Sequence, residues 1–215
     1  MENTEENNLY PLLTESNGNL PRTKEEKELM IKRAEDAYSK FLIAVGFHFL
    51  ADENSRDTPR RVAKAWVNDI ISGTNTEKPK ITTFPSNYTG IVFDGNIEVT
   101  SLCSHHNLAF SGKAYIGYIP GGRVIGLSKL NRIVDWYSRR PQIQEGLTQQ
   151  IHDDLSNILE NNNGVMVVID AMHTCCSHRG IKHKSSMITA SASKYFLENK
   201  DGCKDEFYQF INKLK

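Results

Sequence analysis

Apolar residues recur at helical spacing over residues 23–73, which predicts a helical region near the N-terminus. Thr23 and Glu26 fit a capping box, so the first helix is expected to begin there. A second helix is predicted to begin at the cap residues just before Pro59, because proline is favoured in the first turn. Residues 1–22 lack this spacing and are rich in Asn, Glu, Ser and Gly. We therefore expect them to form a disordered tail.

Residues 74–215 alternate between β and helical patterns and are expected to form one domain, with 74–90 as a connection. Asp94-Gly95 is a turn signal between two short β stretches, and Pro141 is expected to separate two helices. The β patterns lie at 91–93, 97–100, 113–119, 164–171 and 185–193, and the helical patterns at 127–137, 141–159 and 205–214. This order predicts an α+β fold with an antiparallel sheet.

Charge and composition narrow the class of protein. The chain has 26 basic and 26 acidic side chains, and this balance argues against a general nucleic-acid binder. The longest apolar run, residues 41–50, is far shorter than the ~20 residues of a membrane span. The acidic N-terminus does not resemble a secretory signal, and four cysteines are too few for a disulfide scaffold. We therefore expect a cytoplasmic protein in a reducing compartment, with no membrane or nucleic-acid partner.

Cysteine and histidine gather in two segments and form a candidate metal site. The segments are Cys103-Ser104-His105-His106 and His173-Thr174-Cys175-Cys176. Zinc accepts thiolate and imidazole donors in tetrahedral geometry, and a catalytic zinc keeps one position for water. The alternative is that Cys103 and Cys175 are buried thiols and the histidines are ordinary surface groups.

Cations and a carboxylate form a second candidate site, for a phosphorylated ligand. Ser128, Lys129 and Arg132 are spaced to share one helix face, and Arg179 begins a second cationic segment. The alternative for both is a solvated surface. Glu145, which follows Gln144, could accept hydrogen bonds from adjacent donors such as the N1–H and 2-amino group of guanine, although a surface role is the default near a helix start.

Taken together, the order and spacing of these motifs resemble the GTP cyclohydrolase I family from about Lys24 to the C-terminus. The motifs are Asp57-Thr58-Pro59-Arg60-Arg61-Val62-Ala63, Cys103-Ser104-His105-His106, Gly112-Lys113-Ala114, Tyr118-Ile119-Pro120, Val124-Ile125-Gly126-Leu127-Ser128-Lys129, Arg140-Pro141-Gln142-Ile143-Gln144-Glu145, and His173-Thr174-Cys175 followed by Arg179-Gly180. The resemblance implies the tunnelling fold, in which an antiparallel sheet carries two helices on one face. Sheets from several subunits then join into an oligomeric β-barrel, which implies a homo-oligomer, a decamer with active sites between subunits.

The resemblance also implies a reaction and assigns residues to it. The reaction is zinc-dependent hydrolysis of GTP to 7,8-dihydroneopterin triphosphate and formate, the first step of folate and pterin synthesis. The implied metal ligands are Cys103, His106 and Cys175, and the implied acid/base groups are His105 and His173, with Ser128 near the ribose. Gln144 and Glu145 are implied to bind guanine, and Lys129, Arg132, Arg179 and Arg61 to bind the triphosphate, Arg61 from a neighbouring subunit. Cys176 lies outside the motif and is expected to be a bystander.

One position departs from the family pattern. The family usually has Glu between the metal-binding Cys and the catalytic His, whereas this chain has Ser104. Serine can form hydrogen bonds but brings no charge, so the tuning of His105 is expected to differ.

Two rival functions remain at this stage. One is the nitrile reductase of 7-deazaguanine synthesis, which shares the fold but uses a cysteine nucleophile and a nicotinamide cofactor. The other is a non-enzymatic oligomer that is stabilised by zinc and binds guanine nucleotides. The zinc-type pattern argues against the first rival, and the spare histidines His105 and His173 argue against the second.

Overall fold

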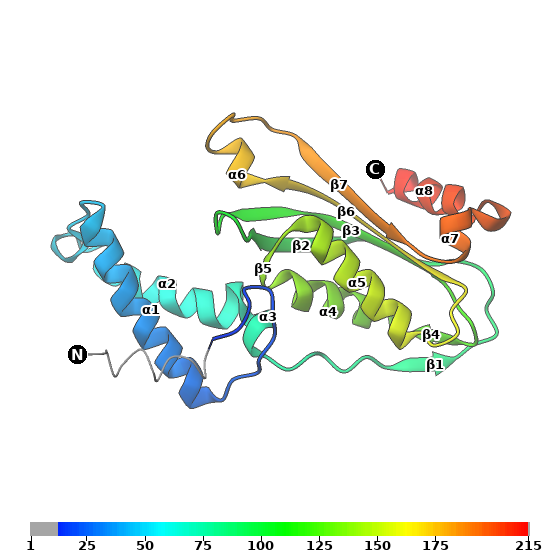
Figure 1. Cartoon of the computed structure of the whole chain (residues 1–215), viewed down its shortest axis with the longest axis horizontal. Coiled ribbons are helices and arrows are strands. Elements are labelled where there is room, and N and C mark those ends of the chain that lie inside the picture. Colours follow the sequence, from blue (N-terminus) through cyan, green and yellow to red (C-terminus); the bar gives the residue numbers. More distant parts are fainter. Residues whose placement is uncertain (1–12, 215) are drawn as a thin grey trace. The chain divides into compact units, whose positions relative to one another are not determined.

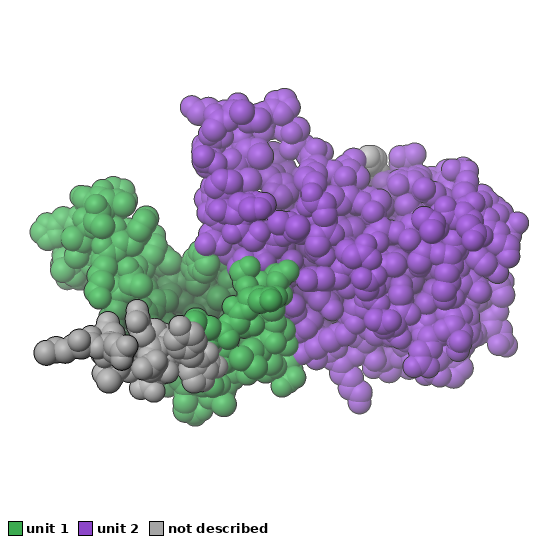
Figure 2. Space-filling model, in the orientation of Figure 1, with its two compact units in different colours: residues 1–77 green, residues 78–215 purple. Residues whose placement is uncertain are grey.

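The structure is a computed structural model that describes residues 13–214. The chain divides into two compact units, residues 1–77 and residues 78–215 (Figure 2). Residues 1–12 of the predicted tail lie outside the described residues. None of the described helices is long and apolar enough to cross a membrane.

The first unit is helical, as predicted. Helix α1 (Lys24–Ala44) begins at the expected capping box: the Thr23 hydroxyl accepts from the Glu26 N–H (3.2 Å), and the Glu26 carboxylate accepts from the Thr23 N–H (2.8 Å). Helix α2 (Thr58–Ala65) has Pro59 in its first turn.

The second predicted helix is not regular up to residue 73, where the predicted helical region ends. It widens into a π-helical turn at Trp66–Ile70, and a short helix, α3 (Ser72–Asn75), follows. The buried Asn75 side chain donates to the Val67 carbonyl (2.9 Å) and thereby satisfies a backbone acceptor at the widened turn. The Asn75 side chain, eight residues after Val67, therefore compensates for the break in the helix. The apolar spacing of the sequence does not reveal this break.

The second unit is built on a five-stranded sheet with the order β5-β2-β3-β6-β7 (Figure 1). All neighbouring strands are antiparallel except β5 and β2. The strands are β2 (Val92–Cys103), β3 (Ala109–Ile119), β5 (Pro141–Gln142), β6 (Gly164–His173) and β7 (Ser186–Ala192). A separate two-stranded sheet joins β1 (Thr83–Pro85) to β4 (Arg123–Ile125). The expected α+β class with a mainly antiparallel sheet is confirmed.

Two details of the predicted strands and helices are wrong. Asp94-Gly95 does not end a strand: β2 continues through it, and the register with β3 shifts between Asp94 and Ile97. Asn96 takes a left-handed φ of 55°, so the turn-type residues form a bulge. Pro141 does not start a helix either, because it lies in β5 and helix α5 begins at Gln144.

Helices cover both faces of the sheet. Helices α4 (Leu127–Ser138) and α5 (Gln144–Ile158) lie on one face, as predicted, and α8 (Cys203–Lys213) lies on the other (Figure 1). Side chains of the central strands point alternately to the two faces of the sheet. Ile116 and Val167 pack in the core between the sheet and α4/α5, whereas Tyr115 and Val168 pack in the core between the sheet and α8. Burial on both faces explains why β6 is almost continuously apolar.

Phe207 is the centre of the α8 layer, and its removal is expected to destabilise the second unit. Its ring is fully buried and packs edge-to-face on Phe93 at 5.4 Å between centroids. It also lies so close to Gly117 that a Cβ there would be 2.6 Å from the ring. We expect Phe207→Ala to lower the free energy of unfolding by about 3–5 kcal/mol. Chemical denaturation at one fixed protein concentration measures this, with Leu197→Ala, at a 69% exposed residue, as the control. Equal losses in both variants would contradict the assignment.

Candidate metal centre and active site

Two strands bring the predicted metal segments together. Both β2 and β6 are antiparallel to β3, which lies between them, so they run in the same direction and end at the same edge of the sheet. Cys103 is the last residue of β2, and His173 is the last residue of β6. Cys175 follows in the short helix α6 (Thr174–Ser177). The topology therefore brings together residues about 70 positions apart in the chain.

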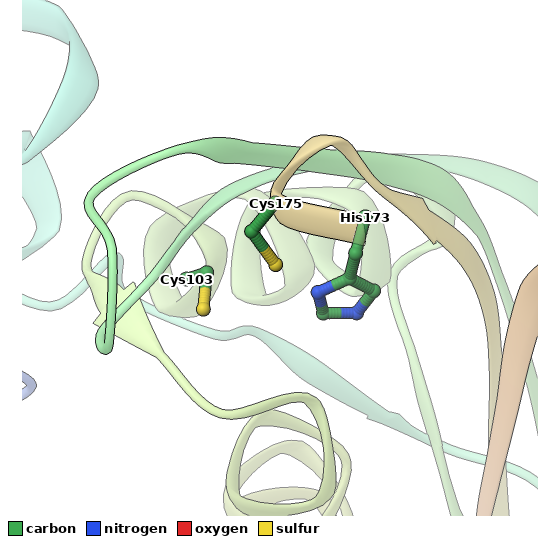
Figure 3. A group of neighbouring side chains, drawn as sticks. All are labelled: Cys103, His173 and Cys175. Carbon is green, nitrogen blue, oxygen red and sulfur yellow. The ribbon is translucent and has the colours of Figure 1, made fainter. Parts of the chain in front are cut away.

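Cys103, His173 and Cys175 form a compact donor cluster. One donor atom from each lies within 4.8 Å of the other two, and Figure 3 shows both sulfurs and one ring nitrogen of His173 facing a common space. Burial, and next the neighbouring Cys103 thiol, raise the pKa of Cys175 to about 11. The Cys175 thiol therefore ionises near neutral pH only when a cation compensates the charge of its thiolate, and a bound metal ion would supply that cation. The donor set therefore fits a metal ion.

His105 and His106 lie on the exposed turn that follows Cys103. Their Nδ1 atoms are 3.7 Å and 3.9 Å from the Cys103 sulfur. Zinc–sulfur and zinc–nitrogen bonds of about 2.3 and 2.1 Å place tetrahedral donors about 3.6 Å apart. Both histidines therefore lie near enough to Cys103 to share an ion with it, although neither belongs to the compact cluster of three.

Arg179 contacts the predicted ligand His106. Its Nη1 lies 3.0 Å from the His106 Nε2. Because a guanidinium can only donate, Nε2 accepts in this arrangement, and the single proton of a neutral ring lies on Nδ1. Binding a metal through Nδ1 would require the proton to move to Nε2. His106 would therefore have to release Arg179 before it could act as an Nδ1 ligand.

His173 is held on two sides. Its ring stacks on the buried Phe110 ring, with centroids 4.5 Å apart and planes 11° from parallel. Its Nε2 lies 2.9 Å from the Gln144 Oε1. Burial lowers the pKa of His173 below its ordinary value, and the Glu145 carboxylate partly opposes this shift. Sequence reasoning did not identify Phe110, because only the strand register reveals that it lies opposite His173.

Gln144 and Glu145 are adjacent in the first turn of α5 but differ in environment. Gln144 is only 1% exposed, and its amide contacts β6 and β7, whereas Glu145 is exposed. Of the pair predicted to bind guanine, Glu145 therefore has the side chain that is accessible to a ligand.

The chain was also compared with known protein families. The sequence model of a family described as "GTP cyclohydrolase I" matches residues 34–212. The chain belongs to the GTP cyclohydrolase I family. It is therefore an enzyme of this type, and the resemblance seen in its motifs is confirmed.

Individual proteins named GTP cyclohydrolase 1 are also similar to this chain. "GTP cyclohydrolase 1" of Flavobacterium johnsoniae is 45% identical over 166 residues, which cover 75% of this chain and 73% of the relative. The protein of the same name from Streptomyces coelicolor is 46% identical over 165 residues, covering 75% and 81% of the two chains. That from Yersinia enterocolitica is 42% identical, covering 75% and 74%.

A GTP cyclohydrolase must also hold a triphosphate and a ribose, and besides Arg179, described above, the residues predicted for these tasks lie on separate elements. Ser128, Lys129 and Arg132 lie on α4, where Ser128 and Arg132 are exposed and Lys129 is half-buried. Among residues 13–214, no hydrogen bond or ion pair connects these three side chains with the cysteine and histidine cluster. Arg61 belongs to the first unit, where it is exposed and lies 3.6 Å from Asp57. The roles of these four residues remain predictions.

Proposed function

We propose that this GTP cyclohydrolase depends on zinc and converts GTP to 7,8-dihydroneopterin triphosphate and formate, as the first step of folate and pterin synthesis. The observation that carries the proposal is the convergence of Cys103 and Cys175, from two distant segments, on one donor cluster that includes histidine. Two thiols and imidazole nitrogen are a donor set suited to zinc.

The proposed ligands are Cys103, His106 and Cys175. Zinc bound by them would supply a Lewis acid that lowers the pKa of water to about 7. His173, whose ring nitrogen faces the two sulfurs, would lie beside the metal and could exchange protons with the reacting groups. His105 would also lie beside Cys103, because its Nδ1 is 3.7 Å from the sulfur.

The protein groups would bind GTP at both of its ends. Glu145 would accept hydrogen bonds from the N1–H and 2-amino group of guanine, and the Lys129, Arg132 and Arg179 side chains would neutralise the triphosphate. Arg61 would contribute a further cation from a neighbouring subunit. Holding both ends would fix C8 of the base at the cluster, so that attack by water becomes effectively intramolecular.

Histidines would move the protons that each step requires. Protonation of guanine N7 by His105 or His173 would make C8 electrophilic, and water would add there. The C8–N9 bond would then break, and hydrolysis of the resulting formamide would release formate. The ribose would open, undergo an Amadori-type rearrangement, and close on the freed amine, with His173 and Ser128 transferring protons at the sugar.

We also propose a cytoplasmic homo-oligomer, a decamer, with active sites between subunits. Within residues 13–214, the outer edge of β7 has no strand partner, and β5 pairs only with Leu102 and Cys103 of β2. Such edges are suited to pairing with strands of further copies, which would extend the sheet into the barrel of the tunnelling fold.

Incubation of the purified protein with GTP tests the proposed reaction. We expect equal amounts of formate and of a pterin that becomes fluorescent on oxidation. We expect a strong chelator to abolish both products, and added zinc to restore them. The reaction should need no nicotinamide cofactor, which separates it from nitrile reduction. Pterin formation that survives complete removal of zinc would contradict the metal requirement, and failure of the zinc-loaded oligomer to form pterin would contradict the reaction.

A further inference from the structure

The side-chain amide of Gln144 has only one orientation that its neighbours allow. One amide atom lies 3.0 Å from the Ile169 carbonyl oxygen and 2.8 Å from the Met187 carbonyl oxygen. A carbonyl oxygen only accepts hydrogen bonds, so the atom facing this pair must be the donor nitrogen, Nε2. The reverse orientation would place the Gln144 oxygen against two other oxygens in a buried site, which is costly.

A chain of hydroxyl groups supports the same orientation. The Thr148 hydroxyl donates to the Gln144 backbone carbonyl (2.9 Å). Having given its only proton there, Thr148 must accept from the Thr189 hydroxyl, 2.6 Å away. Thr189 has then used its own proton, so it accepts from the Gln144 Nε2 at 3.1 Å. The Ile169 carbonyl, the Met187 carbonyl and the Thr189 hydroxyl therefore all require a donor at the position of Nε2.

The orientation of Gln144 determines which nitrogen of His173 carries the proton. With Nε2 of Gln144 directed at the carbonyls, its Oε1 is the atom 2.9 Å from the His173 Nε2. An amide oxygen can only accept, so the His173 Nε2 must donate. In the neutral ring the other nitrogen, Nδ1, then carries a lone pair. This second nitrogen is the one that faces Cys103 and Cys175 (Figure 3).

We infer that Gln144 is a positioning residue that holds His173 as the Nε2–H tautomer and presents the Nδ1 lone pair to the Cys103–Cys175 pair. The stacking of His173 on Phe110 fixes the plane of the ring, and Gln144 fixes its proton. A lone pair on Nδ1 could accept a proton from a molecule that lies beside the two sulfurs, which an N–H could not do. This role differs from guanine binding, and its kinetic part rests on the proposed function.

Two variants of Gln144 and one matched control test this inference. Gln144→Met keeps the length of the side chain but removes both hydrogen-bonding atoms, whereas Gln144→Glu keeps an oxygen acceptor for His173. Gln149→Met changes the same residue type on the same helix at an exposed position. Thermal unfolding of all four proteins, with the wild type included, identifies any variant that does not fold.

The first measurement is independent of activity. The nitrogen-15 spectrum of protein labelled at histidine distinguishes protonated from unprotonated ring nitrogens, and subtraction of the spectrum of His173→Ala identifies the signals of His173. We expect a protonated Nε2 and an unprotonated Nδ1 in the wild type, in Gln149→Met and in Gln144→Glu. We expect this preference to be lost in Gln144→Met. An unchanged His173 spectrum in a folded Gln144→Met would overturn the inference.

The second measurement separates positioning from binding of the base. If Gln144 acts through His173, Gln144→Met lowers kcat for GTP by about 10–100-fold and changes KM little, and Gln144→Glu recovers part of kcat. A raised KM with unchanged kcat would indicate guanine binding and would overturn the inference. Should the wild-type protein not turn over GTP, the proposed function fails, while the nitrogen-15 spectrum still tests the tautomer.

Discussion

Replacement of Cys175 by serine is expected to remove the bound metal and to lower GTP turnover by at least about 100-fold. Cys175 and Cys103 are the two sulfur donors of the cluster, and they come from segments held at one sheet edge only by the fold. Serine is smaller than cysteine and stays protonated at neutral pH. It therefore offers no anionic donor, and the site is left with one thiolate.

The adjacent Cys176 provides the matched control for this variant. It is exposed and lies outside the donor cluster, so Cys176→Ser should keep both metal and turnover. Metal content measured by elemental analysis, alongside formate release, gives both values for each protein. Equal metal in Cys175→Ser and Cys176→Ser would show that Cys175 is not a ligand. Loss of metal in Cys176→Ser would show that the Cys176 thiol, in place of Cys175, binds the metal.

Local sequence signals predicted the features that depend on neighbours in the chain. The capping box at Thr23 and Glu26 uses only residues three apart, and it forms as expected. The apolar run that became β6 was also visible, since burial on both faces leaves a continuous apolar pattern. The convergence of Cys103 and Cys175 followed from motif resemblance, and the parallel direction of β2 and β6 explains it physically.

Features that depend on tertiary pairing could not be predicted in this way. Asp94-Gly95 has turn chemistry, yet pairing with β3 on both sides of it makes it a bulge within one strand. Pro141 was expected to open a helix, but Leu102 and Cys103 pair with Pro141 and Gln142 as a short parallel strand. In both cases the strand partner decides the outcome, and the local sequence does not contain that partner.

The role of Gln144 illustrates the same limit within the site. The family resemblance implies that it binds guanine together with Glu145, and that role stays a prediction. Its amide is directed at carbonyl groups of β6 and β7, more than twenty residues away in sequence. Side-chain type and spacing identified the right helix turn, but only the strand carbonyls show which way the amide points.

Alanine at His106 and alanine at His173 are expected to have different effects, although both should abolish most turnover. His106→Ala removes the proposed third ligand, so we expect it to lose metal and activity together. His173→Ala removes the group proposed to transfer protons beside the two sulfurs, so we expect it to retain metal and to lose about 10²–10⁴-fold in kcat. Elemental analysis and steady-state kinetics of the two purified variants measure both quantities.

The opposite outcome, in which His173 and not His106 is the third ligand, has a clear structural basis. This pair of variants therefore decides which histidine belongs to the ligand set. His173 belongs to the compact cluster with Cys103 and Cys175, whereas His106 is held through its Nε2 by Arg179. Metal lost from His173→Ala and kept in His106→Ala would therefore assign the third ligand to His173. In that case the Nδ1 lone pair that Gln144 selects would bind the metal directly, and His105 would remain as the histidine to transfer protons.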